Sequence, residues 1–422
     1  MAHKTLINGT QYGIKGGKTL ISGTSYSVKN GKTLINGTAY DIKFSIEPGT
    51  IDIGTASDSV DVTCIAYGNG YYVAGINTVS NDGSLTINTA AVAITTDPSS
   101  DWTIVPLWQN NGSNSKALVN DIIFANNTWV AVGVNQTSST YKRANFSYSD
   151  SPIPFKNMSN GILWSGNGEA KCITYANNHW VAGGYTSLST RNYAEIVVID
   201  NIANTTNWKY MELWNSTNSR DACVNSIQYV DTFSRWIIGG SYTNSNNDFG
   251  VVGTAQATVP SSADDWSYDT DSLVGSHINN LIYVDGNFVA AIDSGGSIAI
   301  EYTDNISTST PKWTYLSALD GKLATNATKI RYVNGYYVLC GTYRDMESTW
   351  GVIAYSTSIE GSWTVCKFWN SVLTSSIVND IIFADNCYVT IGYHSSSSLR
   401  IGSVAYAPNI SDFNNLYMEV RT

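Results

Sequence analysis

Apolar and polar residues alternate along most of the chain, in short segments that end at turn sequences. In the clearest segment an aliphatic residue precedes an aromatic one by two positions; an Asn-, Asp- or Gly-containing turn follows, and then a second aromatic residue. Seven copies occur after residue 60: CIAYGNGYYVAG, DIIFANNTWVAVG, CITYANNHWVAGG, SIQYVDTFSRWIIGG, NLIYVDGNFVAAI, KIRYVNGYYVLCG and DIIFADNCYVTIG. A period of two residues predicts half-buried strands, and the turn composition predicts hairpins.

The seven copies follow a regular long period. Their first aromatic residues recur every 49 to 57 positions: Tyr67, Phe124, Tyr175, Tyr229, Tyr283, Tyr332 and Phe383. A third strand follows each copy, and a fourth is expected to open with Trp102, Phe155, Trp208, Trp266, Trp313, Trp363 or Phe413. Periods of this size are typical of propeller blades, which must stack radially because one blade cannot bury both faces alone. The sequence therefore predicts an all-β fold, a seven-bladed β-propeller preceded by a small β-meander of hairpin repeats.

The order of the strands bears on how the ring closes. The pattern starts at an inner strand near Asp61 and ends at an outer strand near Tyr417, so each blade is expected to be complete within itself. The alternative is that residues 50–57 supply an exchanged outer strand.

Some turns between the third and fourth strands have a further likeness. TTDPSSDW and YSTSIEGSW resemble degenerate Asp-boxes, the S-x-D-x-G-x-x-W turns of neuraminidase-type repeats. No copy matches the full pattern. The resemblance implies the propeller fold and not the enzyme.

The first 43 residues carry a different repeat, KTLINGTQYGIK, KTLISGTSYSVK and KTLINGTAYDIK. Asn-Gly between alternating residues is a strong hairpin signal, so about six short strands are expected. Their apolar area is too small for an independent core, which favours attachment to another chain or trimerisation; a flexible tail is the alternative. We divide the chain into repeats at 1–43, a linker at 44–60 and the propeller at 61–422.

Charge separates the same two parts. Six lysines and one acid give residues 1–43 a formal charge of +5, whereas the remaining 17 basic and 32 acidic residues give −15. The large part should repel nucleic acid and anionic membranes. No apolar run is long enough for a membrane span or signal peptide, so a soluble chain without conventional secretion is expected.

The sequence gives little indication of a metal or cofactor. Six scattered cysteines are expected to be free buried thiols: Cys64, Cys172, Cys223, Cys340, Cys366 and Cys387. Zinc is disfavoured because thiolates and imidazoles do not cluster. The acidic pair Asp264 and Asp265 could hold Ca²⁺, although solvated turn residues are the preferred interpretation. We predict no metal and no cofactor.

The tandem repeats KTLINGTAYDIK and their GGK joints resemble short repeats in structural proteins of tailed bacteriophages and related prophage particles. This resemblance implies a tail- or fibre-type virion protein, assembled in the host cytoplasm and located in the virion. Residues 1–43 would then bind other virion proteins, and the propeller would be displayed outward.

A catalytic site is not apparent in the sequence. A sialidase needs clustered arginines, a Tyr with a Glu partner and an Asp acid, but the arginines here do not occur at equivalent positions of three blades. The four histidines are accompanied by no GxSxG elbow. We predict that the chain is not an enzyme and assign no catalytic residues.

Recognition by the loop face is the remaining candidate. Loops between second and third strands, and between blades, open on one side and combine aromatic rings with short polar groups, as sugar or protein recognition requires. The candidate ligand-binding residues are Tyr185, Arg191, Tyr242, Tyr343, Arg344, Tyr393, Arg400, Trp108, Trp214 and Trp369. Because the tryptophans recur at one blade position, packing between blades is the alternative for them. A last group, expected to hydrate the channel mouth, is Asn120, Asn225, Asn279, Asn379 and Lys171.

These observations lead to one preferred function and two alternatives. The first is a phage virion protein whose propeller recognises a host-surface glycan or protein, while the repeats anchor it to the particle. The second is a capsid, neck or tail decoration protein without a ligand. The third is a sialidase-like glycan hydrolase. No nucleic-acid partner and no membrane insertion are expected, and a homotrimer is an open option.

Overall fold

The computed structural model describes residues 3–415 with short gaps, and it describes no side chains before residue 49. The gaps are 8–9, 16–17, 22–23, 30–31, 36–37, 42–48, 54–57, 82–85, 112–114, 139–140, 152, 157, 165, 189–190, 205–206, 216–221, 245–246, 275–276, 294–297, 305–312, 317–323, 345–347, 373–375 and 397–398.

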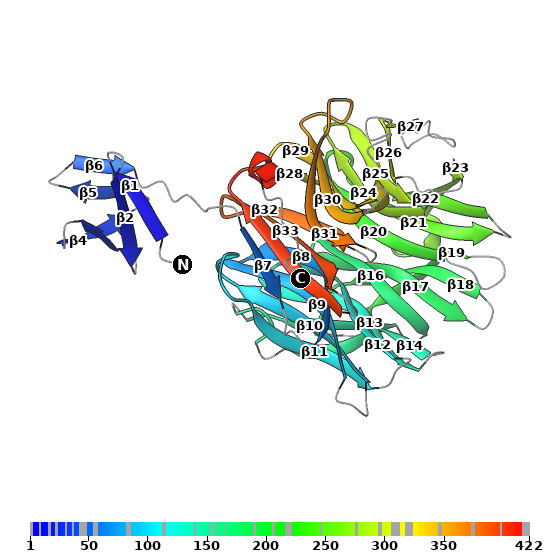
Figure 1. Cartoon of the computed structure of the whole chain (residues 1–422). Helices are drawn as coiled ribbons and strands as arrows, with labels where there is room; N and C mark the ends of the chain where they lie inside the picture. The colour runs from blue at the N-terminus through cyan, green and yellow to red at the C-terminus, as the bar shows by residue number, and fades with distance from the viewer. Residues whose placement is uncertain are drawn as a thin grey trace.

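Seven four-stranded antiparallel sheets form a β-propeller, as the repeats predicted (Figure 1). Blade 1 contains β8 (Ser59–Gly68), β9 (Tyr71–Asn81), β10 (Thr86–Thr95) and β11 (Thr103–Asn111). Blade 2 contains β12 (Lys116–Ala125), β13 (Thr128–Ser138), β14 (Tyr141–Ser149) and β15 (Ser159–Trp164). Blade 3 contains β16 (Asn167–Ala176), β17 (His179–Leu188), β18 (Arg191–Ile199) and β19 (Lys209–Asn215). Blades 4 and 5 are β20 (Ala222–Val230), β21 (Arg235–Asn244), β22 (Asn247–Ala255) and β23 (Trp266–Val274); and β24 (His277–Val284), β25 (Asn287–Asp293), β26 (Ile298–Thr303) and β27 (Thr314–Tyr315). Blades 6 and 7 are β28 (Ala324–Val333), β29 (Tyr336–Arg344), β30 (Ser348–Ser356) and β31 (Thr364–Val372); and β32 (Ser376–Ala384), β33 (Cys387–Ser396), β34 (Leu399–Ala407) and β7 (Gly49–Ile53).

The first two strands of each blade explain the repeated motif. The residues that join them take positive φ, for example Asn126 at 47° and Asn127 at 55°, which is the backbone of a tight hairpin turn. The two motif aromatics then face each other across the pair, as in Phe124 and Trp129 with ring centroids 4.7 Å apart. All seven blades contain this pair, with centroid separations of 4.5 to 5.1 Å. The motif therefore encodes a hairpin with a cross-strand aromatic contact.

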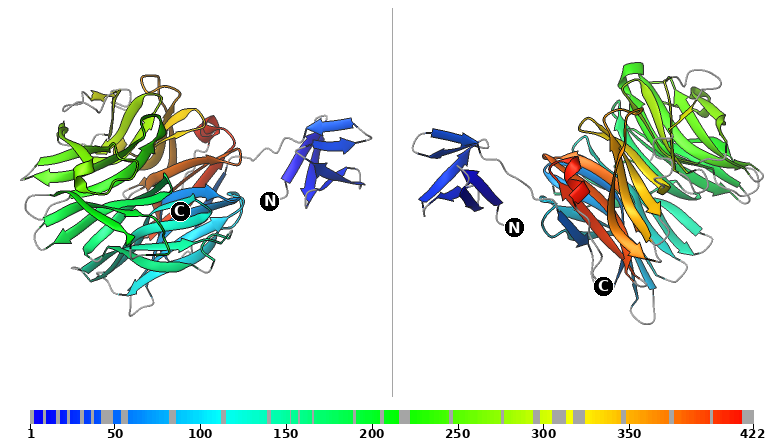
Figure 2. Two further views of the ribbon diagram at one scale, coloured as in Figure 1. Left: turned by 180° about the vertical axis from the view of Figure 1, so that it is seen from behind. Right: turned by 45° about the horizontal axis from the view of Figure 1, so that its top comes forward.

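The hydrophobic core lies between blades and not within them. One cluster joins Val132 and Phe146 of blade 2 to Ala182 and Val197 of blade 3, and the others likewise draw on neighbouring blades. The first strands contact one another around the ring and surround the central channel, as Figure 2 also shows. Each blade is thus stabilised by its neighbours, as expected for a repeat architecture.

The ring closes with an exchanged strand. β7 precedes blade 1 in sequence but pairs antiparallel with β34, where Ile53 faces Gly402 in the register. Phe413 lies in a 3₁₀ helix, η5 (Ile410–Asn415), and not at the start of an outer strand. The expectation that blade 7 is complete within itself is therefore wrong, and the alternative of an exchanged strand from the linker is correct. Part of the segment assigned as a linker at 44–60 belongs to the propeller sheet.

The N-terminal repeats form one six-stranded antiparallel sheet in the order of the chain. Its strands are β1 (His3–Ile7), β2 (Thr10–Lys15), β3 (Lys18–Ile21), β4 (Thr24–Lys29), β5 (Lys32–Ile35) and β6 (Thr38–Asp41). The predicted meander is present, with Ile7 opposite Thr10 in the first hairpin. The Asn-Gly and Ser-Gly turn steps lie outside the described residues.

Glycine ends the motif in six blades, and in five of them the backbone of the first strand lies very close to that glycine. A Cβ atom at Gly133, Gly184, Gly240, Gly341 or Gly392 would lie 1.9 to 2.1 Å from a backbone carbonyl oxygen of that strand. We expect Gly392→Ala to lower the free energy of unfolding by about 1–3 kcal/mol, since the two strands must separate. Urea denaturation measures this difference, and unchanged stability would contradict the steric explanation.

Three further findings concern the described residues as a set. All six cysteines are buried, and none forms a disulfide. No group of three or more His, Cys, Asp or Glu side chains in the described part is placed to hold a metal ion. Within the same residues, no helix has the length and apolar character needed to cross a membrane.

Candidate functional site

A β-bulge interrupts the first strand of every blade at the same point. Each bulge is one extra residue in the first strand, which has no pairing partner on the second strand. The seven inserted residues are Thr63, Asn120, Lys171, Asn225, Asn279, Thr328 and Asn379. Bulges redirect side chains, and all seven of these residues line the central cavity.

Six of the seven inserted residues link their blade to the next one. Asn120 Nδ2, for example, donates to the Ala170 carbonyl at 2.7 Å, and Asn379 Nδ2 donates to the Val62 carbonyl at 2.6 Å across the closure. The corresponding bonds of Thr63, Asn225, Asn279 and Thr328 are 2.6 to 2.8 Å long. The sequence predicted that the amides hydrate the channel, but they form a ring of hydrogen bonds that holds the blades together.

Lys171 is the exception in this ring. Its ammonium group forms an ion pair at 2.7 Å with Glu169, a residue of its own blade. Glu169 also accepts from Asn120 Nδ2 at 2.9 Å and from the Tyr185 hydroxyl at 3.3 Å. Lys142 Nζ in turn donates to the Tyr185 hydroxyl at 2.8 Å. One of the predicted ligand-binding tyrosines therefore belongs to a charged network between blades 2 and 3.

The Glu169 carboxyl is ionised within this network. Burial opposes the charged form, but Lys171, the hydrogen bond from Asn120 and the nearby Lys142 outweigh burial and lower the pKa of Glu169. A buried carboxylate, a tyrosine hydroxyl and two lysines are thus held together where the first and second strands of blade 3 pair.

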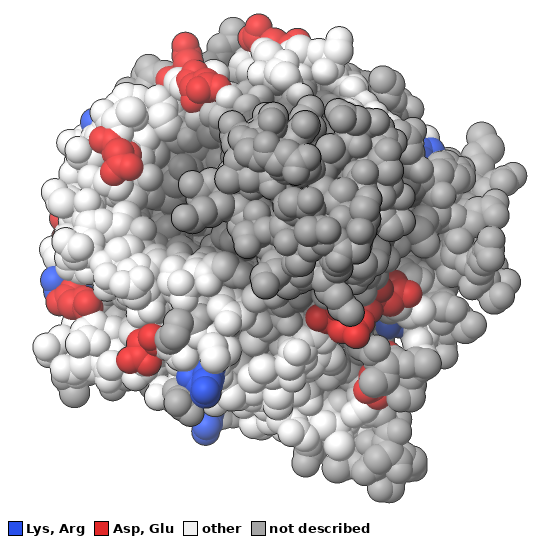
Figure 3. Space-filling model, turned by 90° about the vertical axis from the view of Figure 1, so that its left-hand side faces the viewer, with Lys and Arg blue, Asp and Glu red and all other residues white. Residues whose placement is uncertain are grey.

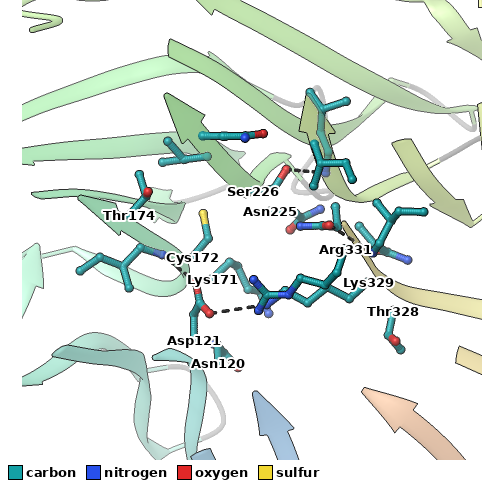
Figure 4. A pocket seen from close by; sticks show the side chains of 18 of the residues that line it. Asn120, Asp121, Lys171, Cys172, Thr174, Asn225, Ser226, Thr328, Lys329 and Arg331 are labelled. Atoms are coloured by element: carbon teal, nitrogen blue, oxygen red, sulfur yellow. Dashed lines mark hydrogen bonds and ion pairs between the residues drawn. The ribbon is translucent and has the colours of Figure 1, made fainter. Parts of the chain in front are cut away.

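A second charged network crosses the channel. Arg331 donates from Nε and Nη2 to the two carboxylate oxygens of Asp380, at 2.9 and 2.8 Å. Lys329 Nζ lies 3.3 Å from Asp380 and 3.5 Å from Asp121 of blade 2, so the network connects blades 6, 7 and 2. Figure 4 shows the part of the network between Lys329 and Asp121. Asp380 has no exposed side-chain surface. The backbone N–H groups of Ile65 and Ile381 also donate to its carboxylate.

Electrostatics keeps this network charged in spite of burial. Burial alone would raise the pKa of Asp380, but Arg331, Lys329 and the hydrogen bonds lower it below its usual range. Burial and the Arg331 charge oppose the ammonium form of Lys329, yet Asp380 and Asp121 leave its pKa raised. The cluster is consequently an ionised set at neutral pH.

The cavity enclosed by these residues measures about 460 Å³. Its wall contains amides, hydroxyls and charged groups from several blades, namely Asn120, Asn225, Asn279, Asn280, Asn379, Gln228, Thr63, Thr174, Ser226, Thr328, Lys171, Lys329, Arg331 and Asp121. In blades 2 to 6 these residues extend from about the middle of the first strand toward the hairpin turn. The cavity therefore lies toward the opposite side from the loop face that the sequence favoured.

The other predicted tyrosines lie in separate blades, and each has a neighbour over its ring. Lys367 Nζ lies 4.0 Å from the ring centroid of Tyr343, and the guanidinium of Arg400 lies 4.7 Å from that of Tyr393. Arg400 also forms an ion pair with Asp61 at 2.7 Å. Tyr242 stacks on Phe249, Arg344 is exposed, and the Arg191 side chain lies outside the described residues. These residues do not form one constellation, and ligand binding by them stays a prediction.

The three predicted tryptophans pack between blades. Trp108 and Trp369 are buried in hydrophobic clusters, and Trp214 is partly buried against another. The indole N–H groups of Trp108 and Trp214 donate to the Val134 and Ser241 carbonyls of the next blade, at 2.9 and 3.1 Å. The packing alternative describes them better than the ligand-binding assignment does, because their aromatic faces contact protein.

Sequence reasoning missed the charged residues that cross the channel. Asp121, Lys329 and Arg331 line the channel one or three positions after a bulge residue, and Asp380, one position after Asn379, is buried beside them. A signal was available for the two cations, because no other blade carries Lys or Arg at either position.

Comparison with known proteins finds similar folds among solved structures. No family model and no curated protein sequence matches the chain. Among solved structures it resembles a phage phi92 endosialidase, with 12% identity over 89% of this chain and 70% of the other and a TM-score of 0.48. It also resembles Trypanosoma rangeli sialidase, with 11% identity, 93% and 58% coverage and a TM-score of 0.48. An ulvan lyase, a polysaccharide lyase, gives 8% identity, 87% and 100% coverage and a TM-score of 0.53.

These likenesses correct one prediction. The chain was predicted not to be an enzyme, but the ulvan lyase shows that a glycan-processing enzyme shares its fold over the whole of that enzyme's length. The exclusion is wrong, because the absence of a sialidase arginine pattern says nothing about other reactions on glycans. At these identities the likeness establishes the fold alone.

Proposed function

We propose that the propeller is a glycan-recognising module of a phage particle, with the central cavity as its sugar site and residues 1–43 as its attachment. The observation that carries the glycan assignment is the wall of the cavity. Amides of Asn225, Asn279 and Gln228 and hydroxyls of Thr174 and Ser226 line one cavity. Short polar groups of both donor and acceptor character are what a set of sugar hydroxyls requires.

The size of the cavity agrees with this assignment. A volume of about 460 Å³ lies within the range of roughly 300–1,000 Å³ typical of small-molecule sites. Hydrogen bonds between blades fix the surrounding side chains: Asn225 Nδ2 is bound to the Ile278 carbonyl, and Ser226 Oγ accepts from the Leu281 N–H. Polar groups held in this way lose little conformational entropy on binding, which favours recognition of a rigid sugar ring.

The attachment role rests on the N-terminal repeats. Their likeness to repeats of phage structural proteins and their charge of +5 support contact with an acidic partner in the particle. The sheet that they form has few residues in each strand, and such a sheet gains stability from a partner.

A variant that fills the cavity tests the glycan proposal. Thr174 lines the cavity, so Thr174→Tyr should reduce binding to a glycan array or to host cells at least about tenfold by steric exclusion. Thr357→Tyr, at an exposed turn, is the matched control and should bind like the unaltered chain. Release of reducing ends from each bound glycan shows whether recognition is followed by cleavage. Binding that survives in the Thr174 variant would place the site elsewhere, and no binding to any glycan would refute the proposal.

A further inference from the structure

Each position of the first strand occurs seven times around the channel, once in each blade. The residue that one blade carries can therefore be compared with its six equivalents. At the bulge position six blades carry Asn or Thr, and blade 3 carries Lys171. At the next position Asp121, Ser226, Asn280 and Asp380 accept a backbone N–H of the following blade, and blade 6 instead carries Lys329. Blades 1 and 3 carry Cys64 and Cys172 there, so blade 6 is the one blade with a cation at this position. Arg331 is likewise the one charged residue at its position, which is neutral in the other six blades. Each of the three cations therefore occupies a position where no other blade has one. Such departures are expected where function overrides the requirements of folding.

The departures gather in one place. Lys329 and Arg331 are two residues apart on β28, and Figure 4 shows both side chains reaching across the channel toward Asp121. Lys171 lies in blade 3 and lines the same cavity. Lysines and an arginine from two separate blades therefore surround a single space.

The ion pairs leave Lys329 incompletely satisfied. Its Nζ lies 3.3 and 3.5 Å from two carboxylates, which exceeds the roughly 2.7–2.9 Å of a charge-assisted hydrogen bond. Arg331 binds Asp380 through Nε and Nη2 at short distances, so it mainly secures the buried carboxylate. Lys329 lines the cavity, and 18% of its side chain is exposed there, so a ligand in the cavity would contact it.

The cations of the cavity wall have part of their counter-charge behind the wall. Lys171, Lys329 and Arg331 face the cavity with one acid, Asp121. Glu169 and Asp380, which pair with these cations, are not among the lining residues, and with them the cluster is formally neutral. Figure 3 shows acidic side chains dispersed on the outer face that it draws. Low-dielectric walls concentrate the field of like charges and attract counter-charge into a cavity.

We infer that the cavity recognises an anionic substituent of its glycan, a carboxylate or a sulfate, through the ammonium group of Lys329. This inference rests on the proposed function and specifies its ligand class. Arg331 and Asp380 position Lys329 by fixing the strand beside it, and the neutral amides contact the sugar ring. A sugar without the charged group would form no ion pair with Lys329, and would bind more weakly.

Three glycosides that share one ring test this inference: methyl β-D-glucuronide, methyl β-D-glucoside 6-sulfate and neutral methyl β-D-glucoside. Dissociation constants with the full chain are measured by ligand-observed NMR at low and high salt. We expect the better of the two charged glycosides to bind at least about tenfold more tightly than the neutral one, with an advantage that falls as salt rises. The comparison between glucuronide and sulfate identifies the preferred group.

Variants then assign the effect to Lys329. Lys329→Gln should remove the preference for charged glycosides, Lys329→Arg should retain it, and Lys156→Gln, at an exposed turn, should leave it unchanged. Thermal unfolding of each variant verifies that it is folded. Equal binding of charged and neutral glycosides, no binding of either charged glycoside, or a preference that persists in a folded Lys329→Gln chain would overturn the inference. Glycan-array binding that Thr174→Tyr abolishes would, in each of those cases, leave the proposed function standing.

Discussion

Removal of residues 1–57 is expected to destabilise the propeller, whereas removal of residues 1–43 is expected to leave it folded. The longer deletion removes β7, whose Ile53 is 3% exposed and whose Ile51 packs against the same cluster. Loss of these two side chains from the core should lower the free energy of unfolding by about 3–5 kcal/mol. It also exposes β34 as an unpaired edge, which favours aggregation. Urea denaturation and size-exclusion chromatography of the two truncated chains measure both effects.

The shorter deletion is the control, and it also examines the attachment proposal. A chain that starts at residue 44 retains β7 and should match the stability of the full propeller. If residues 1–43 attach the protein to a particle, this chain is folded but absent from purified particles. Equal destabilisation by both deletions would show that the repeats belong to the propeller core, and normal incorporation would refute their role in attachment.

Asp380→Ala is expected to cost about 3–5 kcal/mol of stability, because it leaves Arg331 and Lys329 without their buried counter-charge. The variant also removes the acceptor for the Ile65 N–H across the closure between blades 7 and 1. Asp231→Ala, at an exposed position, is the matched control and should change stability by less than about 0.5 kcal/mol. A small effect at Asp380 would indicate that the cluster is not needed for stability.

The same carboxylate gives the unaltered chain a defined response to acid. Its pKa is lower in the folded state than in the unfolded chain, so the folded state binds fewer protons there. The Asp380 contribution is therefore fully present above the unfolded pKa of about 3.9 and is lost as the pH falls through the folded value. Between pH 5 and pH 3 the difference in stability between the unaltered chain and Asp380→Ala should begin to narrow. A constant difference across this range would contradict the assignment.

Local sequence signals were sufficient to predict the strands and turns of the blades. The hairpin turns, the facing aromatics such as Phe124 and Trp129, and the period of the copies all depend on neighbours in sequence or on the adjacent strand. Packing of the tryptophans followed from their recurrence at one blade position. These features were predictable because each blade repeats the same local structure.

The site was predicted less well because it depends on residues far apart in the chain. Nothing local indicates that Lys329 lies near Asp121, more than 200 positions away, or that Tyr185 joins the network of Glu169 and Lys142. The polar composition of the loops pointed to the loop face, whereas the cavity lies toward the hairpin turns. The comparison of equivalent blade positions could have singled out the three cations, since no other blade carries a cation at any of their positions.

The sequence by itself determined the number of blades, the strand order within most of them and the meander of the N-terminal repeats, because periodicity and turn chemistry act over a few residues. Only the tertiary structure decided how the ring closes, since the pairing of β7 with β34 joins residues about 350 positions apart. It likewise decided where charge gathers, because the channel exists only after seven first strands have been brought around one axis.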